Sequence, residues 1–120
     1  MLYEESIPEY IRAIRLNPIP PNKYIWSLGL AYGFTGQYEE AIKWCEKAVH
    51  QEPNDLLAQV MMTQVYSWSG RDEEAQAQTA EVHRIQPKFS LKKWEKKVTY
   101  KNETDREKIL GALRKAGLPE

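Results

Sequence analysis

The sequence predicts an all-α protein, a stack of antiparallel helical hairpins with about seven helices. Two observations lead to this fold class. A segment of about 34 residues recurs along the chain, and each copy contains two runs of helical periodicity separated by a glycine. Because one such hairpin cannot bury its own apolar face, adjacent copies must stack to form a core.

The repeat is clearest in two glycine-led segments. Residues 36–41 (GQYEEA) align with residues 70–75 (GRDEEA) at an offset of 34 residues, and Pro53 aligns with Pro87 at the same offset. Residues 3–7 (YEESI) resemble residues 38–42 (YEEAI) at an offset of 35. The chain therefore contains two full copies and the second half of an earlier one.

Each full copy predicts two helices joined by a tight turn. The first copy predicts helices over residues 22–34 and 38–51, and the second predicts helices over residues 56–69 and 72–85. Gly36 lies where a helix end favours positive φ. Pro53 ends the second helix, and Asn54-Asp55 supplies an N-cap for the next.

The elements divide the 120 residues into one domain with four segments. Residues 1–21 are the second helix of a truncated repeat and a linker, residues 22–55 and 56–89 are full repeats, and residues 90–120 are capping helices. The first helix lacks a repeat partner, so we expect the chain to be a fragment of a longer repeat protein. The open face of that helix is a candidate for self-association.

The spacing resembles the tetratricopeptide repeat, whose pattern is W-x2-L-G-x2-Y, then A-x3-F, then P. The first copy supplies Ile25, Leu28, Gly29, Tyr32, Ala41, Cys45 and Pro53, and the second supplies Gln59, Met62, Thr63, Tyr66, Ala75, Thr79 and Pro87. The resemblance covers residues 3–87, and the second copy departs further from the pattern. It implies a right-handed superhelical stack that acts as a protein-binding scaffold.

The last third of the chain predicts a capping pair. Ser90 is placed to cap a helix whose apolar face holds Leu91, Trp94 and Val98. Residues 104–107 (TDRE) match the capping box of a last helix, which Gly117 would end, with Leu118 placed for a hydrophobic contact.

The tail, residues 105–120, is also similar to the C-terminal tails of certain bacterial repeat proteins. Some of those proteins carry a nucleotide-cyclase-type or transcription-regulator domain. No cyclase residues occur in this chain, so the similarity implies no cyclase activity.

In the tetratricopeptide family the first helix of each hairpin lines a concave groove that binds a partner. The resemblance implies groove residues Trp26, Leu30, Phe34, Val60, Gln64, Ser67, Trp68, Trp94 and Val98. These apolar and aromatic side chains favour an apolar extended peptide or an amphipathic helix as ligand. The alternative is that the aromatic side chains pack against each other as core.

Chaperone-docking relatives grip an acidic C-terminal tail with a clamp of Lys, Asn and Arg. The corresponding positions here hold Trp26, Ser27, Leu30 and Met61, so that kind of partner is not expected.

Charge is unevenly distributed, although the net charge is zero. Residues 88–120 carry a net charge of +5 and residues 1–87 a net charge of −5. The lysines of the cap are Lys92, Lys93, Lys96, Lys97 and Lys101. They support a second hypothesis, a regulatory module that binds an acidic surface or nucleic acid electrostatically. Because no nucleic-acid motif is present, nucleic acid is the less expected partner, and a solvated cap face is the simpler interpretation.

The sequence offers no catalytic, metal or cofactor site. His50 and His83 lie near helix ends without metal-like neighbours, and Cys45 is interpreted as a small buried apolar residue. We therefore expect neither an enzyme nor a small-molecule substrate. The longest apolar run is too short to span a membrane, and the first residues do not form a signal peptide. These features favour a cytoplasmic location.

Overall fold

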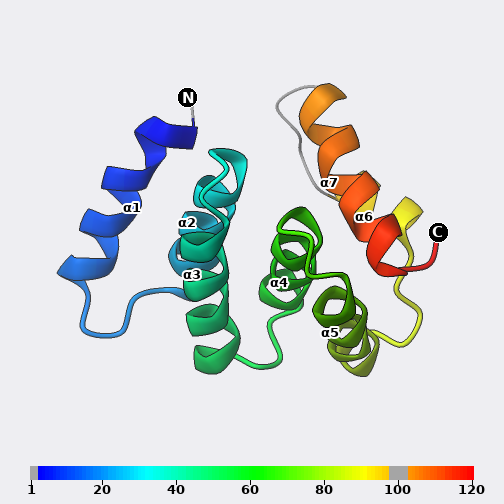
Figure 1. The fold of residues 1–120 in the computed structure, drawn as a ribbon. Coiled ribbons are helices and arrows are strands. Elements are labelled where there is room, and N and C mark those ends of the chain that lie inside the picture. The colour runs from blue at the N-terminus through cyan, green and yellow to red at the C-terminus, as the bar shows by residue number, and fades with distance from the viewer. Residues whose placement is uncertain (1–2, 98–102) are drawn as a thin grey trace.

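The computed structural model describes residues 3–97 and 103–120, and these residues form seven helices (Figure 1). In chain order they are α1 (Tyr3–Leu16), α2 (Asn22–Phe34), α3 (Tyr38–Gln51), α4 (Leu56–Trp68), α5 (Asp72–Ile85), α6 (Leu91–Lys97) and α7 (Glu103–Ala116). The predicted fold class is confirmed. The four helices of the full repeats lie where the sequence predicts them, except that α4 ends one residue earlier.

Neighbouring helices pack in sequential pairs. α2 packs most extensively against α3, and α4 packs against α5, so each full repeat folds as a hairpin. Both helices of the first hairpin contact α4 and thereby join the two hairpins. α1 packs against α2 at one end of the stack, and α7 packs against α4 and α5 at the other (Figure 1).

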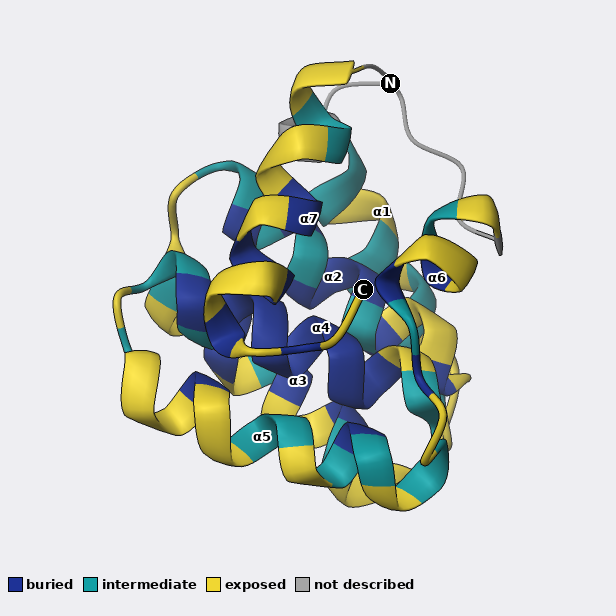
Figure 2. Ribbon diagram, turned by 90° about the vertical axis from the view of Figure 1, so that its right-hand side faces the viewer, coloured by how far each residue is buried: buried dark blue, intermediate teal, exposed yellow. Residues whose placement is uncertain are grey.

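Buried residues lie mainly on the helix faces that turn toward the other helices (Figure 2), and most of them form one core cluster. The largest fully buried side chains include Leu28 of α2, Met62 of α4, and Leu110 and Leu113 of α7. Full burial of such a side chain contributes about 1.5–3 kcal/mol. The C-terminal helix therefore belongs to the same core as the repeats.

Three helices, α2, α4 and α7, end in the same glycine turn. Gly36, Gly70 and Gly117 have φ angles of 82°, 79° and 106°. After each glycine the next residue donates its N–H to the carbonyl five residues earlier, at 3.0, 2.9 and 3.2 Å respectively. This is the Schellman geometry, which glycine adopts without the Cβ penalty of other residues. The helix ends predicted at Gly36 and Gly117 are confirmed.

Asp55 caps α4 and also ties the two hairpins together. Its Oδ1 accepts the backbone N–H groups of Leu57 at 3.1 Å and Ala58 at 3.5 Å, which confirms the predicted N-cap. Its Oδ2 accepts the side-chain amide of Asn22, at the start of α2, at 2.8 Å. The start of α2 is therefore held by the residue that caps the start of α4.

A glycine in α2 allows the two helices of the first hairpin to approach closely. A Cβ atom added to Gly29 of α2 would lie 2.6 Å from the Sγ atom of Cys45 and 3.2 Å from the carbonyl oxygen of Ala41 in α3. A real Cβ atom essentially never lies as close as 2.6 Å to a neighbouring atom, and 3.2 Å is tighter than nine in ten real Cβ contacts. The absence of a side chain at Gly29 therefore sets how closely α2 and α3 approach.

The chain's last residues cap α6. Ser90 Oγ accepts the Lys93 N–H at 3.4 Å, as predicted for an N-cap. The N–H groups of Leu91 and Lys92 donate to the carbonyl oxygens of Pro119 and Glu120 at 2.9 and 3.2 Å. We call this arrangement the C-terminal clasp.

The capping box predicted at residues 104–107 is wrong, because Thr104 already lies inside α7. The side chain of Glu103, one residue earlier, instead pairs with Arg106 at 2.8 Å. Arg106 also pairs with Glu95 of α6 and so links the two capping helices. Leu118 is buried in the core, as predicted after Gly117.

Candidate partner-binding surface

The predicted groove residues of α2 share one helical face. Trp26, Leu30 and Phe34 follow one another at intervals of four residues, and each is partly exposed while its inner edge packs on the core. Such spacing places the three side chains in a row along the helix. We call this row the α2 face.

The predicted groove does not continue along α4. Val60 and Gln64 have no exposed surface, and Ser67 is buried at 6% exposure. The reason is that α7 packs against α4, and its side chains Ile109, Leu110 and Leu113 join the same core cluster as Val60. The part of the groove assigned to α4 is therefore filled by the chain's own last helix.

Trp94 of α6 is also a core residue. It is only 6% exposed, and its ring lies 5.7 Å from the ring of Phe89. Val98, which was expected to extend the row, lies outside the described residues. Trp94 therefore does not line an open surface.

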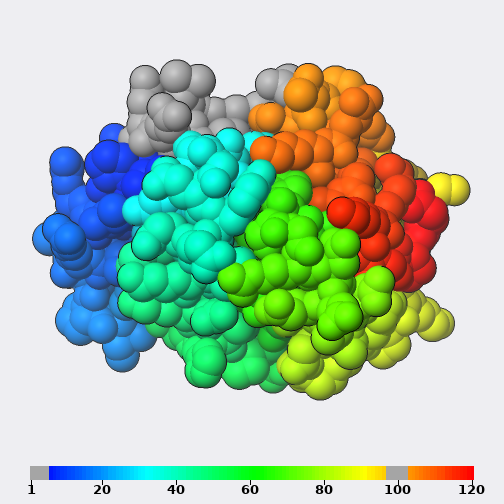
Figure 3. Space-filling view, in the orientation of Figure 1, coloured from blue at the N-terminus to red at the C-terminus, as the bar shows by residue number. Residues whose placement is uncertain are grey.

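Trp68 and Phe34 close one end of the α2 face. Their ring centroids lie 5.0 Å apart in an edge-to-face arrangement. The Nζ atom of Lys108 in α7 lies 4.7 Å from the Trp68 ring centroid and 5.3 Å from that of Phe34. Trp68 Nε1 donates to the Lys108 carbonyl oxygen at 3.3 Å. In the space-filling view α7 meets the end of the first hairpin here (Figure 3).

Sequence reasoning missed two residues of this cluster, Gly33 and Lys108. A Cβ atom at Gly33 would lie 2.7 Å from the Trp68 ring, so the glycine makes room for that ring. The signal available in the sequence was a second glycine on α2 with no place in the repeat pattern. Lys108 gave no signal, because its position depends on how α7 folds back onto the hairpins.

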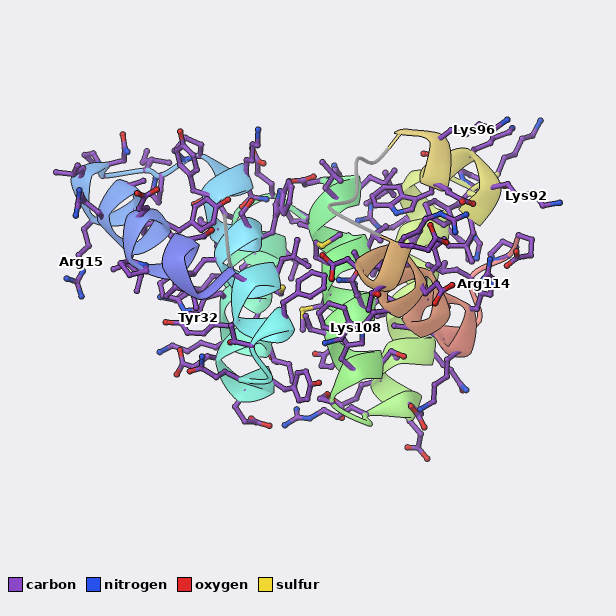
Figure 4. The ribbon with its side chains drawn as sticks, turned by 90° about the horizontal axis from the view of Figure 1, so that it is seen from above. Arg15, Tyr32, Lys92, Lys96, Lys108 and Arg114 are labelled. Carbon is purple, nitrogen blue, oxygen red and sulfur yellow. The ribbon has the colours of Figure 1, made fainter. Side chains whose placement is uncertain are left out.

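The basic cap forms a second polar surface. Lys92, Lys93 and Lys96 are exposed, and Lys92 and Lys96 project away from the helices (Figure 4). Within the described part of the chain, no carboxylate lies within ion-pair distance of these three lysines. The side chains of Lys97 and Lys101 lie outside the described residues.

Cys45 and His50, which were considered as reactive or metal-binding residues, lie in surroundings typical of structural residues. Cys45 is fully buried, and burial, followed by the nearby Glu46 charge, raises the pKa of its thiol from 9.0 to about 12. His50 Nδ1 lies 3.2 Å from the Glu46 carbonyl oxygen, one turn earlier in its own helix. The described residues contain no group of His, Cys, Asp and Glu that could hold a metal ion.

The repeat segment is similar to a known protein family. Residues 35–92, from the end of α2 into α6, match the family described as tetratricopeptide repeat. This segment is similar to the tetratricopeptide repeat. The family is a non-catalytic helical repeat that generally mediates protein–protein interaction. The match says nothing about the cyclase-type or regulator proteins that the tail resembles.

No curated protein matches this chain. Among the helices that the structure describes, none is both long enough and apolar enough to cross a lipid bilayer.

Proposed function

We propose that this chain is a non-catalytic interaction module that binds an apolar segment of a partner protein over the α2 face. The observation that carries the proposal is the row of partly exposed Trp26, Leu30 and Phe34 on one side of α2. Trp is the residue most often found at interface hot spots, because covering its remaining surface removes a large apolar area from water.

The shape of the surface favours a short ligand. Trp68 and Lys108 close the α2 face at one end, and α7 occupies the neighbouring α4 side. A segment of about two helical turns, with apolar residues at i and i+4, matches the spacing of Trp26 and Leu30. The family resemblance predicts a long groove, which would bind a long segment. The closed α2 face instead favours a short amphipathic helix as ligand.

The proposal is tested with a peptide selected from a displayed library of short helical segments. Its affinity for the chain is measured by fluorescence anisotropy, and we expect Trp26→Ala to weaken binding about 30-fold, equivalent to about 2 kcal/mol. Leu57→Ala is the matched control, because Leu57 is 38% exposed but lies on α4. Thermal melts show whether each variant remains folded.

Failure to select any binding peptide would count against the proposal. Unchanged affinity in a folded Trp26→Ala variant would contradict the α2 face directly.

A second candidate function rests on the lysines of the cap. Lys92, Lys93 and Lys96 are exposed and oriented outward, so they could attract an anionic partner such as an acidic protein surface or nucleic acid (Figure 4). Binding of this kind falls steeply with salt concentration. Loss of partner binding in Lys92→Glu and Lys96→Glu, with Trp26→Ala unaffected, would favour this candidate over the α2 face.

A further inference from the structure

The outer face of α1 differs chemically from the same face of its repeat counterpart, α3. At the offset of 35, five polar or charged residues of α3, all exposed, align with five residues of α1 of which three are apolar. The α3 residues are Lys43, Glu46, Lys47, His50 and Gln51, and the α1 residues are Pro8, Ile11, Arg12, Arg15 and Leu16. A helix face that only meets solvent does not need these apolar side chains.

The outer face is opposite the side on which α1 packs. Ile14 packs against the cluster of Ile25, Ala48 and Ala58, and the Tyr10 ring lies 6.4 Å from that of Tyr24 in α2. The five outer residues lie on the other side, where they line one shallow pocket. Arg15 projects away from all other helices (Figure 4).

This face is unusually apolar for its exposure. Leu16 is 74% exposed, and Ile19, just beyond the helix, is 81% exposed. They are the two most exposed of the large hydrophobic residues that the structure describes. Covering them would remove apolar surface from water, at about 25 cal/mol for each Å².

The charges of α1 indicate what covers it. Along the sequence, the first half of the helix carries Glu4, Glu5 and Glu9, and the second half carries Arg12 and Arg15. A second α1 laid antiparallel would place its acidic half against the basic half of the first. The apolar residues would then lie between two rows of opposite charge, in the self-complementary arrangement that two-fold symmetry requires.

We propose that α1 is a self-association surface, on which a second copy of this chain packs its own α1 in antiparallel orientation. The surface is distinct from the α2 face, so a partner segment and a second copy can bind at the same time. α1 has 14 residues and is therefore about 21 Å long, which makes the contact small. We expect a dissociation constant on the order of 100 µM.

The proposal is tested by sedimentation velocity on the full chain from about 10 µM to about 1 mM, a range that brackets this affinity. The expected result is a reversible monomer–dimer equilibrium. Leu16→Lys should abolish the dimer, because it replaces a large exposed apolar side chain of the contact, 74% exposed in the single chain, with a charge. Leu57→Lys is the matched control, since it changes another exposed leucine, and should leave the dimer intact.

A charge exchange tests the orientation. Arg12→Glu with Arg15→Glu, and separately Glu5→Lys with Glu9→Lys, should each weaken self-association at least tenfold, because like charges then face each other. An equimolar mixture of the two double variants should associate again, because opposite charges are restored across the pair. Trp26→Ala should not alter the dimer, so this proposal and the α2 face can fail separately.

A strict monomer over the whole concentration range would overturn the proposal and would leave the outer face to a different occupant, such as a preceding repeat. A dimer that survives Leu16→Lys, or a mixture of charge variants that stays monomeric, would overturn it as well.

Discussion

The two full hairpins have the same residue spacing, but different kinds of side chain lie where their two helices meet. In the first, Gly29 lets α2 approach Cys45 of α3, and the contact is apolar and close. The aligned positions in the second hairpin hold Thr63 and Thr79. Thr63 donates to the carbonyl oxygen of Gln59, one turn earlier, at 3.0 Å, so its buried hydroxyl has a partner within its own helix.

Gln59 shows how the second hairpin manages its polar core. It stands where the first hairpin has Ile25, and it is 4% exposed. Its side-chain amide donates to the Pro53 carbonyl oxygen at 2.8 Å, and its side-chain oxygen accepts from Gln78 of α5. The second hairpin therefore holds polar residues at apolar positions, where the buried groups of Gln59 and Thr63 have hydrogen-bond partners.

The largest expected effect is on the close contact of the first hairpin. Gly29→Val should lower the free energy of unfolding by about 3 kcal/mol, because its side chain would overlap Cys45 and the backbone of Ala41. Gly111→Ala is the matched control. An added Cβ there meets no atom within 4 Å, so we expect a gain of about 0.5–1 kcal/mol from helix propensity. Urea denaturation measures both, and a Gly29→Val variant as stable as the parent would contradict the close-contact argument.

The second prediction concerns the hydrogen bonds of the other hairpin. Gln59→Leu nearly keeps the side-chain volume but leaves the amide of Gln78 without this acceptor. We expect a loss of about 1–2 kcal/mol in the free energy of unfolding, although leucine is the more apolar residue. The double variant with Gln78→Leu should recover part of that loss. If Gln59→Leu by itself raises the free energy of unfolding, the hydrogen bonds of Gln59 stabilise the second hairpin less than an apolar side chain at the same position would.

The third prediction concerns Gln64, a buried polar residue whose side chain lacks hydrogen-bond partners among the described residues. Gln64 is fully buried, and neither its amide nitrogen nor its amide oxygen has a hydrogen-bond partner among the described residues. Its counterpart in the first hairpin is Leu30. Gln64→Leu should therefore raise the free energy of unfolding by about 1 kcal/mol. A destabilised variant in the same denaturation experiment would mean that Gln64 is hydrogen-bonded in solution.

The smallest expected effect on stability near neutral pH concerns the Cys45 thiol. Its pKa is raised by burial from 9.0 to about 12, so the folded state keeps the proton that the unfolded state loses near pH 9. The contribution of this thiol to stability is therefore complete below about pH 9 and declines as the pH rises toward 12. A Cys45→Ala variant should lack this decline. In the folded chain at pH 8, Cys45 should react with iodoacetamide only as fast as the chain opens, which mass spectrometry can follow.

Much of the fold could be predicted from the sequence, because it depends on local signals. Gly36, Gly117 and Asp55 each fix a helix end through hydrogen bonds to neighbours a few residues away. The candidate site was less predictable. Val60 and Trp94 are buried by contacts with the cap, and the repeat spacing carries no information on how α7 packs against α4. Thr104 was misleading because a capping-box pattern also occurs inside a helix.

The C-terminal clasp has a consequence for the order in which the protein is made. Ser90 and Glu120 are thirty residues apart in sequence, yet the start of α6 is hydrogen-bonded to the carbonyl groups of residues 119 and 120. Synthesis proceeds at about 5–20 residues per second, so these groups are added only seconds after α6 itself. While the nascent chain is still being extended, the two hairpins can already pack together, but the N–H groups of Leu91 and Lys92 lack these acceptors. The start of α6 therefore reaches its final hydrogen bonding only after residues 119 and 120 have been added.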